Sequence, residues 1–495
     1  MRCFLLATLI ALLGACASSH PHLYSQDLHG CFSQLAMFKQ EVNRQKVNDA
    51  QVVNLAAFPY LAFDRFSQSQ LSRLSSQQDR EQWLDYTAQL ATQQRQAEYH
   101  NLIANPYDLA ALDTCAEKMV KEAKHNEKVW AELKQQTVSI PDSYEPWLRV
   151  FGLYPISSQI AQSSIDKEKK WILLGFHAPP KDIVQYQLTE TISDSGIAAS
   201  QHKGGQAHIN RELITSWFSD ALDTSTIHWP QLSKTTISQL YQYYSPLINI
   251  ETASADDIPG TVNYVDSQHK PAVDTSQPAI YLHHSYTQLY GKIYLQLNYS
   301  LWFANRTPTS SFDPYAGKFD GVLLRLTLDH QGRPMLLDSI HHCGCYHMVF
   351  NFSDKFVFDN AKPDTESPLL FNRPAPFDLP TWSVTLSHGE HMIKQVGWLA
   401  KKDLPNANKV QSLVGHHYDQ LRQLPSHQQH TISLFDQRGM LAGSERLEST
   451  YLWPFGIPSA GAMRQLGHHA IAFIGIRHFD QPRLFEQILR PKTEP

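Results

Sequence analysis

An alternating run between residues 293 and 303 constrains the fold of this chain more than any other feature of its sequence. Successive side chains of a strand point to opposite faces, so the residues of one face recur at every second position. One face of this run is apolar and consists of Ile293, Leu295, Leu297, Tyr299, Leu301 and Phe303. The opposite face is polar and aromatic and consists of Tyr294, Gln296, Asn298, Ser300 and Trp302. The run predicts a long strand with two chemically different faces.

Hairpin signals follow this strand along the chain. Residues 322–328 alternate in the same way and end in a turn from Asp329 to Gly332, where glycine can adopt the left-handed conformation of a short loop. A return strand from about Met335 to His342 completes the predicted hairpin, and similar turn signals occur at 387–390 and 436–439. We predict a larger antiparallel β-rich domain over residues 280–495, a sandwich or an open barrel that closes with C-terminal helices near 459–474 and 484–489.

Residues 25–150 show the three- and four-residue spacing of helices instead. One apolar stripe consists of Leu28, Cys31, Phe32, Leu35, Phe38 and Val42, and another of Leu109, Leu112, Cys115 and Met119. A further helical stretch runs through Trp83 and Leu90. These stripes predict a helical N-terminal domain, and with the β-rich domain they give an α+β fold class.

The region between these two domains carries weaker signals. Residues 151–250 form a mixed α/β segment, in which 171–176 favours a strand while 209–217 and 236–244 favour short helices. Residues 251–279 contain many Asp, Ser, Pro and Gly residues with little apolar periodicity. We therefore expect a connector over 251–279.

The first residues carry a targeting signal. Met1-Arg2 precedes an apolar run from Phe4 to Leu13, and Leu13-Gly14-Ala15-Cys16 follows it. This segment resembles the signal peptide and lipobox of bacterial lipoproteins, and the run is shorter than the roughly 20 residues that span a bilayer. The resemblance implies a signal peptide over 1–15, a lipid-anchor linker over 16–24, and acylation of Cys16 with palmitate or a similar chain. The alternative is an ordinary secreted protein.

The residues after Cys16 bear on the compartment. In lipoproteins, Asp directly after the acylated cysteine favours the inner membrane, whereas Ala17 and Ser18 stand here. The resemblance therefore implies anchoring to outer-membrane lipid, with the body of the protein in the periplasm. The stretch from Gln296 through Asp320 to His347 also resembles segments of uncharacterised proteobacterial proteins, to which no activity is attached.

Four cysteines between residues 31 and 345 would then lie in an oxidising compartment, where three pairings are open to them. Cys31 and Cys115 both lie on apolar faces of separate predicted helices. We therefore predict a disulfide between them, which would close a long loop. The alternative is a pair of buried thiols.

A cluster of soft metal ligands ends the predicted return strand. His341, Cys343, Cys345 and His347 would share one face of a regular strand. The outer two would then lie roughly 20 Å apart, so one tetrahedral ion cannot be reached by all four unless the chain turns, and Gly344 could allow that turn. A turned chain would suit Zn(II) or Cu(I). The alternatives are a Cys343–Cys345 disulfide, which we favour over the metal, and unligated thiols.

Polar residues near this cluster could form a ligand-binding pocket. The candidates are Gln296, Asn298, Trp302, Arg306, Arg325 and Asp338. Asp338 could orient His341 or His347, and Arg306 could bind a carboxylate or phosphate through two hydrogen bonds. The alternative is a solvated sheet face with an ordinary Arg–Asp pair.

Composition and missing motifs narrow the function. The 495 residues carry a net charge of −5, which argues against a nucleic-acid partner. We find no nucleophile elbow, zinc-protease helix, phosphate loop or dinucleotide fingerprint. We predict an outer-membrane lipoprotein that binds a small ligand or a metal around residues 338–347. The alternatives are a metal-dependent enzyme, and an assembly protein that contacts another envelope protein and contains a structural Cys343–Cys345 disulfide.

Overall fold

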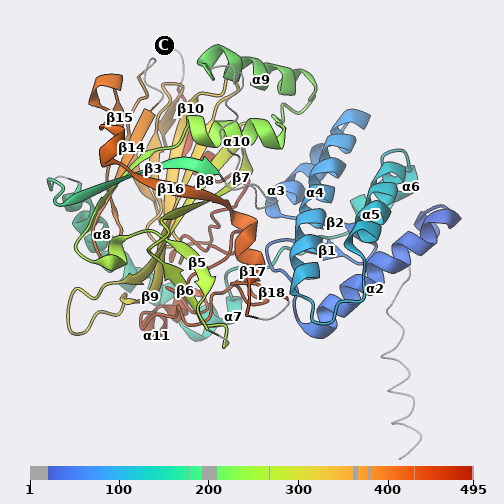
Figure 1. Cartoon of the computed structure of the whole chain (residues 1–495), viewed down its shortest axis with the longest axis horizontal. Coiled ribbons are helices and arrows are strands. Elements are labelled where there is room, and N and C mark those ends of the chain that lie inside the picture. The colour runs from blue at the N-terminus through green and yellow to red at the C-terminus, as the bar shows by residue number, and fades with distance from the viewer. Residues whose placement is uncertain are drawn as a thin grey trace, which may run out of the picture.

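The computed structural model describes residues 21–176, 178–191, 209–266, 268–359, 366–376, 381–427 and 430–492. The protein has an α+β fold, in which an N-terminal helical part lies beside one large sheet (Figure 1). The predicted signal peptide and Cys16 lie outside the described residues. Among those described, no helix combines the length and the apolar character needed to cross a bilayer.

The helical part matches the spacing of the sequence but contains strands as well. Its helices are α2 (His29–Gln45), α3 (Arg65–Gln70), α4 (Gln77–Asn101), α5 (Leu109–Ala123) and α6 (Glu127–Gln135). A small hairpin, β1 (Val53–Leu55) with β2 (Phe58–Phe63), packs among them. The stripe on α2 buries Phe32, Leu35, Phe38 and Val42. Cys31 on α2 is bonded to Cys115 on α5, so the disulfide joins two helices 84 residues apart in sequence.

One sheet of eleven strands forms the centre of the molecule and curves into a half-barrel. In spatial order its strands are β13 (Leu369–Asn372), β11 (Met348–Asn351), β10 (Pro334–His341), β9 (Gly317–Leu328), β8 (Lys292–Arg306), β7 (Ala279–Leu289), β16 (Gln411–His417), β3 (Ile183–Thr191), β4 (Leu247–Glu251), β14 (Thr381–Leu386) and β15 (Ile393–Leu399). The five strands from β7 to β11 form the predicted antiparallel meander.

The sheet as a whole is mixed, which differs from the purely antiparallel expectation. Four of its ten strand pairs are parallel: β11 with β13, β7 with β16, β16 with β3, and β4 with β14. In three of these pairs, β7 with β16, β16 with β3, and β4 with β14, the two strands lie far apart along the chain. Parallel neighbours need long crossover connections, so local turn signals do not reveal them.

The remaining elements surround the sheet. The helices are α7 (Pro146–Phe151), α8 (Tyr154–Gly175), α9 (Arg211–Asp223), α10 (Lys234–Tyr243) and α11 (Ser449–Leu452). The short strands are β5 (Thr261–Tyr264), β6 (Pro271–Asp274), β12 (Phe356–Phe358), β17 (Leu424–Pro425), β18 (Thr431–Ile432) and β19 (Leu489–Pro491). The predicted connector 251–279 thus contains the β5–β6 hairpin.

Two local predictions of secondary structure, one near residue 171 and one over 459–474, are wrong. Residues 171–175 belong to the end of α8 and form no strand, because the short apolar run there continues a helix rather than starting a new element. Residues 459–474 form turns and take part in two isolated bridges, at Arg464 and Ala470, instead of forming a helix. Gly461 and Gly467 take φ values of 86° and 90° there, which lie outside the helical region.

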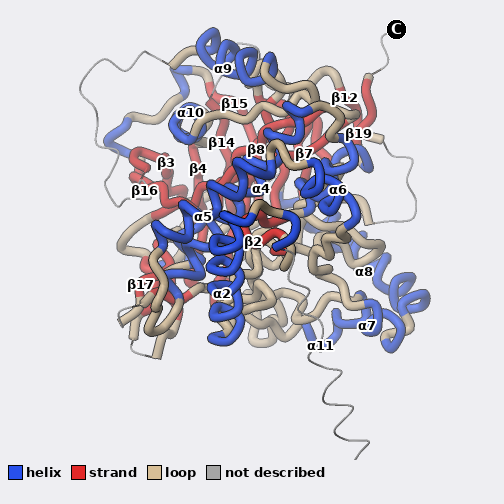
Figure 2. The backbone as a smooth tube through the Cα atoms, turned by 90° about the vertical axis from the view of Figure 1, so that its right-hand side faces the viewer, coloured by secondary structure: helices blue, strands red, loops and turns tan. Residues whose placement is uncertain are grey.

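Both faces of β8 are buried. Its apolar face joins the main core, where Tyr299 contacts Tyr241 and Trp382. Its polar face lies under the helical part and the C-terminal segment, so that Gln296 and Asn298 are only 2% and 3% exposed. Figure 2 shows α2, α4 and α5 in front of the strands. The alternative of a solvated sheet face is therefore wrong.

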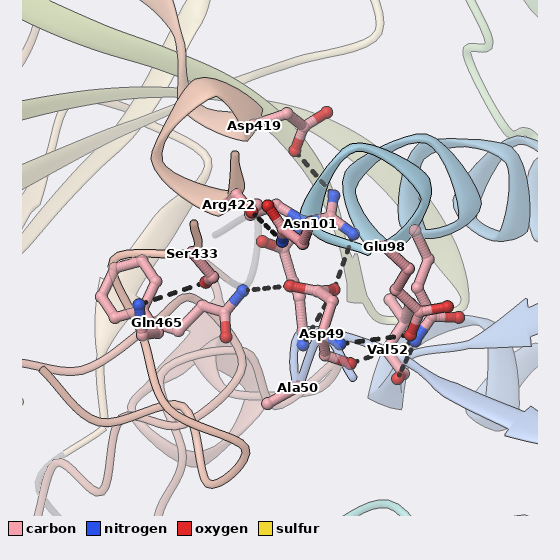
Figure 3. Close-up of polar contacts among 12 residues, drawn as sticks. Asp49, Ala50, Val52, Glu98, Asn101, Asp419, Arg422, Ser433 and Gln465 are labelled. Carbon is pink, nitrogen blue, oxygen red and sulfur yellow. Dashed lines mark hydrogen bonds and ion pairs between the residues drawn. The ribbon is translucent and has the colours of Figure 1, made fainter. Parts of the chain in front are cut away.

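A buried polar cluster joins the helical part to the C-terminal segment (Figure 3). The Asp49 carboxylate accepts hydrogen bonds from Arg422 Nη2 at 2.7 Å and from Gln465 Nε2 at 2.8 Å. Asn101 at the end of α4 donates to the backbone carbonyl of Arg422 at 2.9 Å. All four residues are buried, so the two parts pack as one body.

Candidate ligand cavity

A tight turn separates β10 from β11. The Gly344 N–H donates to the His341 carbonyl at 2.7 Å, and the His341 N–H donates to the Cys345 carbonyl at 3.0 Å. Gly344 has φ of 92°, and a Cβ on it would lie 2.3 Å from the Ala470 carbonyl oxygen. Only glycine fits this position without a shift of the backbone. The turn breaks the alternation of side chains that the sequence implied.

Because of this turn, the four residues of the predicted metal site do not come together. His341 Nδ1 lies 3.5 Å from Asp320, whereas His347 Nε2 lies 3.3 Å from Asp338, so the turn directs the two rings to different carboxylates. Among the described residues, no group of three or more His, Cys, Asp or Glu side chains is placed to hold a metal ion. The zinc or copper site proposed for His341, Cys343, Cys345 and His347 is therefore not supported.

The predicted Cys343–Cys345 disulfide is also absent. Both residues carry free thiols, and the Cys345 N–H points to Cys343 Sγ at 3.4 Å. The hydrogen bond with Cys343, together with burial, raises the pKa of the Cys345 thiol well above its usual range. At neutral pH Cys345 is therefore a protonated, weakly nucleophilic thiol.

Cys343 and Cys345 line a cavity with a volume of about 460 Å³, which is larger than a second cavity of about 100 Å³ under the helical part. The larger cavity lies between α8, the β10–β11 turn and the segment 448–473. Its apolar lining includes Ile160, Ala161, Ile165, Ile172, Leu369, Leu452, Phe455, Ile457, Ala470, Ile471 and Phe473. Its polar lining includes Glu168, Lys169, Tyr315, Cys343, Cys345, Tyr346, His347, Glu366, Glu448 and Tyr451. The walls are thus mainly apolar, and the polar groups are mostly carboxyls, phenols and thiols, with one ammonium and one imidazole.

Three carboxyls among these groups are poorly solvated. Burial raises the pKa of Glu448 to about 7, and it also raises the pKa of Glu168 and of Glu366. Burial lowers the pKa of Lys169, whose ammonium donates to the Ser367 carbonyl at 2.6 Å. Burial therefore favours the uncharged form of each of these four groups.

Arg306, one of the predicted ligand residues, lies behind the cavity wall. Its Nη2 lies 3.4 Å from Tyr346 Oη and 3.3 Å from Glu390 Oε1. Its guanidinium also lies 5.5 Å from the centre of the Tyr346 ring, in a cation–π contact. Arg306 thus supports Tyr346, which lines the cavity, rather than lining it directly.

A second group of predicted residues forms a polar row across the sheet. The register places His283, Asn298, Arg325 and Asp338 side by side on β7, β8, β9 and β10. Arg325 binds both oxygens of Asp338, at 2.9 and 2.6 Å, and its guanidinium lies 3.5 Å from the centre of the Phe479 ring. Asn298, Arg325 and Asp338 are buried, His283 at the end of the row is partly exposed, and Asp338 is already occupied by Arg325.

The predicted residues therefore divide between two cavities. Gln296, Asn298 and Arg325 line a smaller cavity of about 100 Å³ under the helical part. Cys343, Cys345 and His347 line the larger one, and Asp338 lies buried beside His347. Trp302 lines neither cavity and stacks on His342, with ring centres 4.2 Å apart.

Sequence reasoning did not find a buried chain of alternating acids and histidines beside the turn. His391 Nδ1 lies 2.8 Å from Asp320 and its Nε2 lies 3.5 Å from Asp257, while Asp320 also contacts His341. Burial alone would lower the pKa of His391, but the two carboxylates raise it above its usual value. These partners come from four distant segments, so no spacing in the sequence could reveal them.

Comparison of the chain with protein-family models, curated proteins and solved structures finds no match. The larger cavity combines a volume of about 460 Å³ with mainly apolar walls, which are common features of small-molecule sites.

Proposed function

We propose that the protein binds an apolar, lipid-like small molecule in the larger cavity. The observation that carries this proposal is the cavity itself, whose volume of about 460 Å³ falls within the range of roughly 300–1,000 Å³ typical of small-molecule sites. Its walls are mostly aliphatic and aromatic, so an apolar ligand would gain roughly 25 cal/mol for each Å² of apolar surface that it removes from water.

The polar lining favours a neutral polar group on the ligand. Three carboxyls, those of Glu168, Glu366 and Glu448, stand against the one ammonium of Lys169, so the lining offers an anionic head no net positive charge. A protonated Glu448 carboxyl can donate a hydrogen bond to a carbonyl or hydroxyl oxygen. We therefore expect an amide, ester or alcohol to bind more tightly than a carboxylate of the same size.

The proposal includes the compartment that the signal peptide implies. A lipid-anchored body on the periplasmic side of the outer membrane would lie beside a large supply of apolar molecules. Acylation of Cys16 would hold it there without a spanning helix.

Titration with 1-N-phenylnaphthylamine, a neutral apolar probe that fluoresces outside water, tests the cavity. Ala161 lines the cavity on α8, and the neighbouring Gln162 is exposed. We expect Ala161→Phe to fill the cavity and weaken probe binding at least tenfold, whereas Gln162→Phe should change affinity less than twofold. Circular dichroism would show that both variants fold. Equal affinity of Ala161→Phe and the unaltered chain would contradict the proposal.

A further inference from the structure

Helices α7 and α8 leave an unusually large apolar surface uncovered. α8 has 22 residues, about 33 Å of helix, yet Ile172 is its only buried residue, and α7 buries none. Large apolar side chains on these helices are each between 51 and 74% exposed: Trp147, Val150, Phe151, Leu153, Ile156, Ile160, Trp171 and Leu174. We call these eight residues the α7–α8 face. A surface helix of a globular protein normally turns such a stripe to the core.

The α7–α8 face is continuous with the cavity. Ile156, Ile160, Trp171 and Leu174 follow one another at helical spacing along one side of α8. The adjacent side of the same helix lines the cavity. Ile160 belongs to both, because it lines the cavity and is 71% exposed. The face therefore borders the cavity mouth.

The charges around the face suit an anionic surface. Of the four basic residues in 146–175, Arg149 and Lys169 donate to backbone carbonyls. The other two are exposed, with one exposed acidic residue, Asp166, beside them. Lys167 and Lys170 are exposed near Trp171, on the same helix. Exposed tryptophans with apolar and basic neighbours are typical of helices that lie in the interface of a bilayer.

We propose that the α7–α8 face docks on the surface of a bilayer that contains anionic phospholipid, and that it brings the cavity mouth against the lipid. The second half of this statement rests on the proposed function. Because no described helix can span a bilayer, the face would lie in the interface, with its side chains roughly 5–10 Å deep.

Quenching of tryptophan fluorescence by brominated lipid tests the docking with the full chain. The protein would be bound to vesicles of brominated phosphatidylcholine with phosphatidylglycerol. We expect strong quenching, and we expect the double variant Trp147→Tyr, Trp171→Tyr to lose at least half of it. The variant Phe151→Glu, Ile156→Glu should lose a similar share of the quenching, because both residues belong to the face. Neither residue lines the cavity, so this variant leaves the cavity unchanged.

A matched control uses the other side of the molecule. Met37 on α2 and Ile103 just after α4 are 52% and 59% exposed, and α2 and α4 lie at the right of the sheet while α8 lies at the left (Figure 1). Met37→Glu, Ile103→Glu should keep the full quenching. Unchanged quenching in Phe151→Glu, Ile156→Glu would overturn the proposal. A second outcome would also overturn it. The unaltered chain would show no quenching and would form a dimer in sedimentation experiments, and this variant would be monomeric.

The experiments distinguish a failure of the membrane-docking proposal from a failure of the ligand-binding proposal. Phe151→Glu, Ile156→Glu should still bind the naphthylamine probe from solution with unchanged affinity, because the cavity is intact. Loss of probe binding in Ala161→Phe tests the cavity alone. Absence of probe binding with full lipid quenching would overturn the proposed function and leave the docking standing.

Discussion

At the scale of single residues, Glu448 is a cavity carboxyl whose ionisation the fold opposes. Its side chain lies in the cavity wall, and burial raises its pKa from the ordinary value of 4.5 to about 7. Between these two values the folded protein keeps a proton that the unfolded chain has released. Stability must therefore fall as the pH rises through this window.

The variant Glu448→Gln removes this dependence. We expect the unaltered chain to lose on the order of 3 kcal/mol of unfolding free energy between pH 4.5 and pH 7 through this group. Glu448→Gln should lose less over this range and should be the more stable protein at pH 8, as urea unfolding would measure. Glu445→Gln, at an exposed position nearby, is the control. The same pH dependence in Glu448→Gln as in the unaltered chain would contradict this assignment.

Asp338 shows the opposite case, a buried carboxylate that the fold stabilises. Burial alone would raise its pKa, but Arg325 and His347 hold the pKa below its usual value. Asp338→Asn would leave the Arg325 guanidinium buried without its counter-ion, at a cost of about 3–5 kcal/mol in unfolding free energy.

The double variant Arg325→Met, Asp338→Leu provides the comparison. It removes both charges, so it should cost less than Asp338→Asn alone. Thermal and urea unfolding of the two variants would measure the difference. A larger loss in the double variant would show that the pair is not the dominant interaction at this position.

At the scale of elements, local periodicity predicted β8, β9 and β10 well, because each strand places alternating residues in different surroundings. It failed at the β10–β11 turn, where Gly344 with φ of 92° ends the alternation. It also failed at residues 171–175, because a short apolar run is compatible with either a strand or a helix. The surroundings of α8 decide this, and they come from segments near residues 343 and 448–473.

The disulfide between α2 and α5 belongs to the same scale. It closes a loop of 84 residues, so its removal should cost about 4 kcal/mol in the chain-entropy account. We expect Cys31→Ser, Cys115→Ser to lower unfolding free energy by roughly this amount in urea. Cys343→Ser, Cys345→Ser removes two unbonded thiols and should have a much smaller effect. If the two double variants lowered the unfolding free energy equally, the stabilising role of the Cys31–Cys115 disulfide would be contradicted.

At the scale of the whole molecule, function depends on contacts that the sequence cannot display. The larger cavity is assembled from α8, the β10–β11 turn and the segment 448–473, which lie far apart along the chain. The sequence drew attention to Cys343, Cys345 and His347, because soft and polar side chains cluster there, and all three line this cavity. It could not predict that Glu448, Tyr315 and Ile160 complete the same cavity, since long-range packing decides which residues meet.

Protection of the two cavity thiols by a bound ligand tests the central claim most directly. Cys343 and Cys345 would be labelled with a maleimide at pH 9, with and without saturating 1-N-phenylnaphthylamine, and the labelled peptides would be quantified by mass spectrometry. Because both thiols line the cavity, we predict that the bound probe slows their labelling at least tenfold. Unchanged labelling of Cys343 and Cys345 while the probe is bound would contradict the assignment of this cavity as the ligand site.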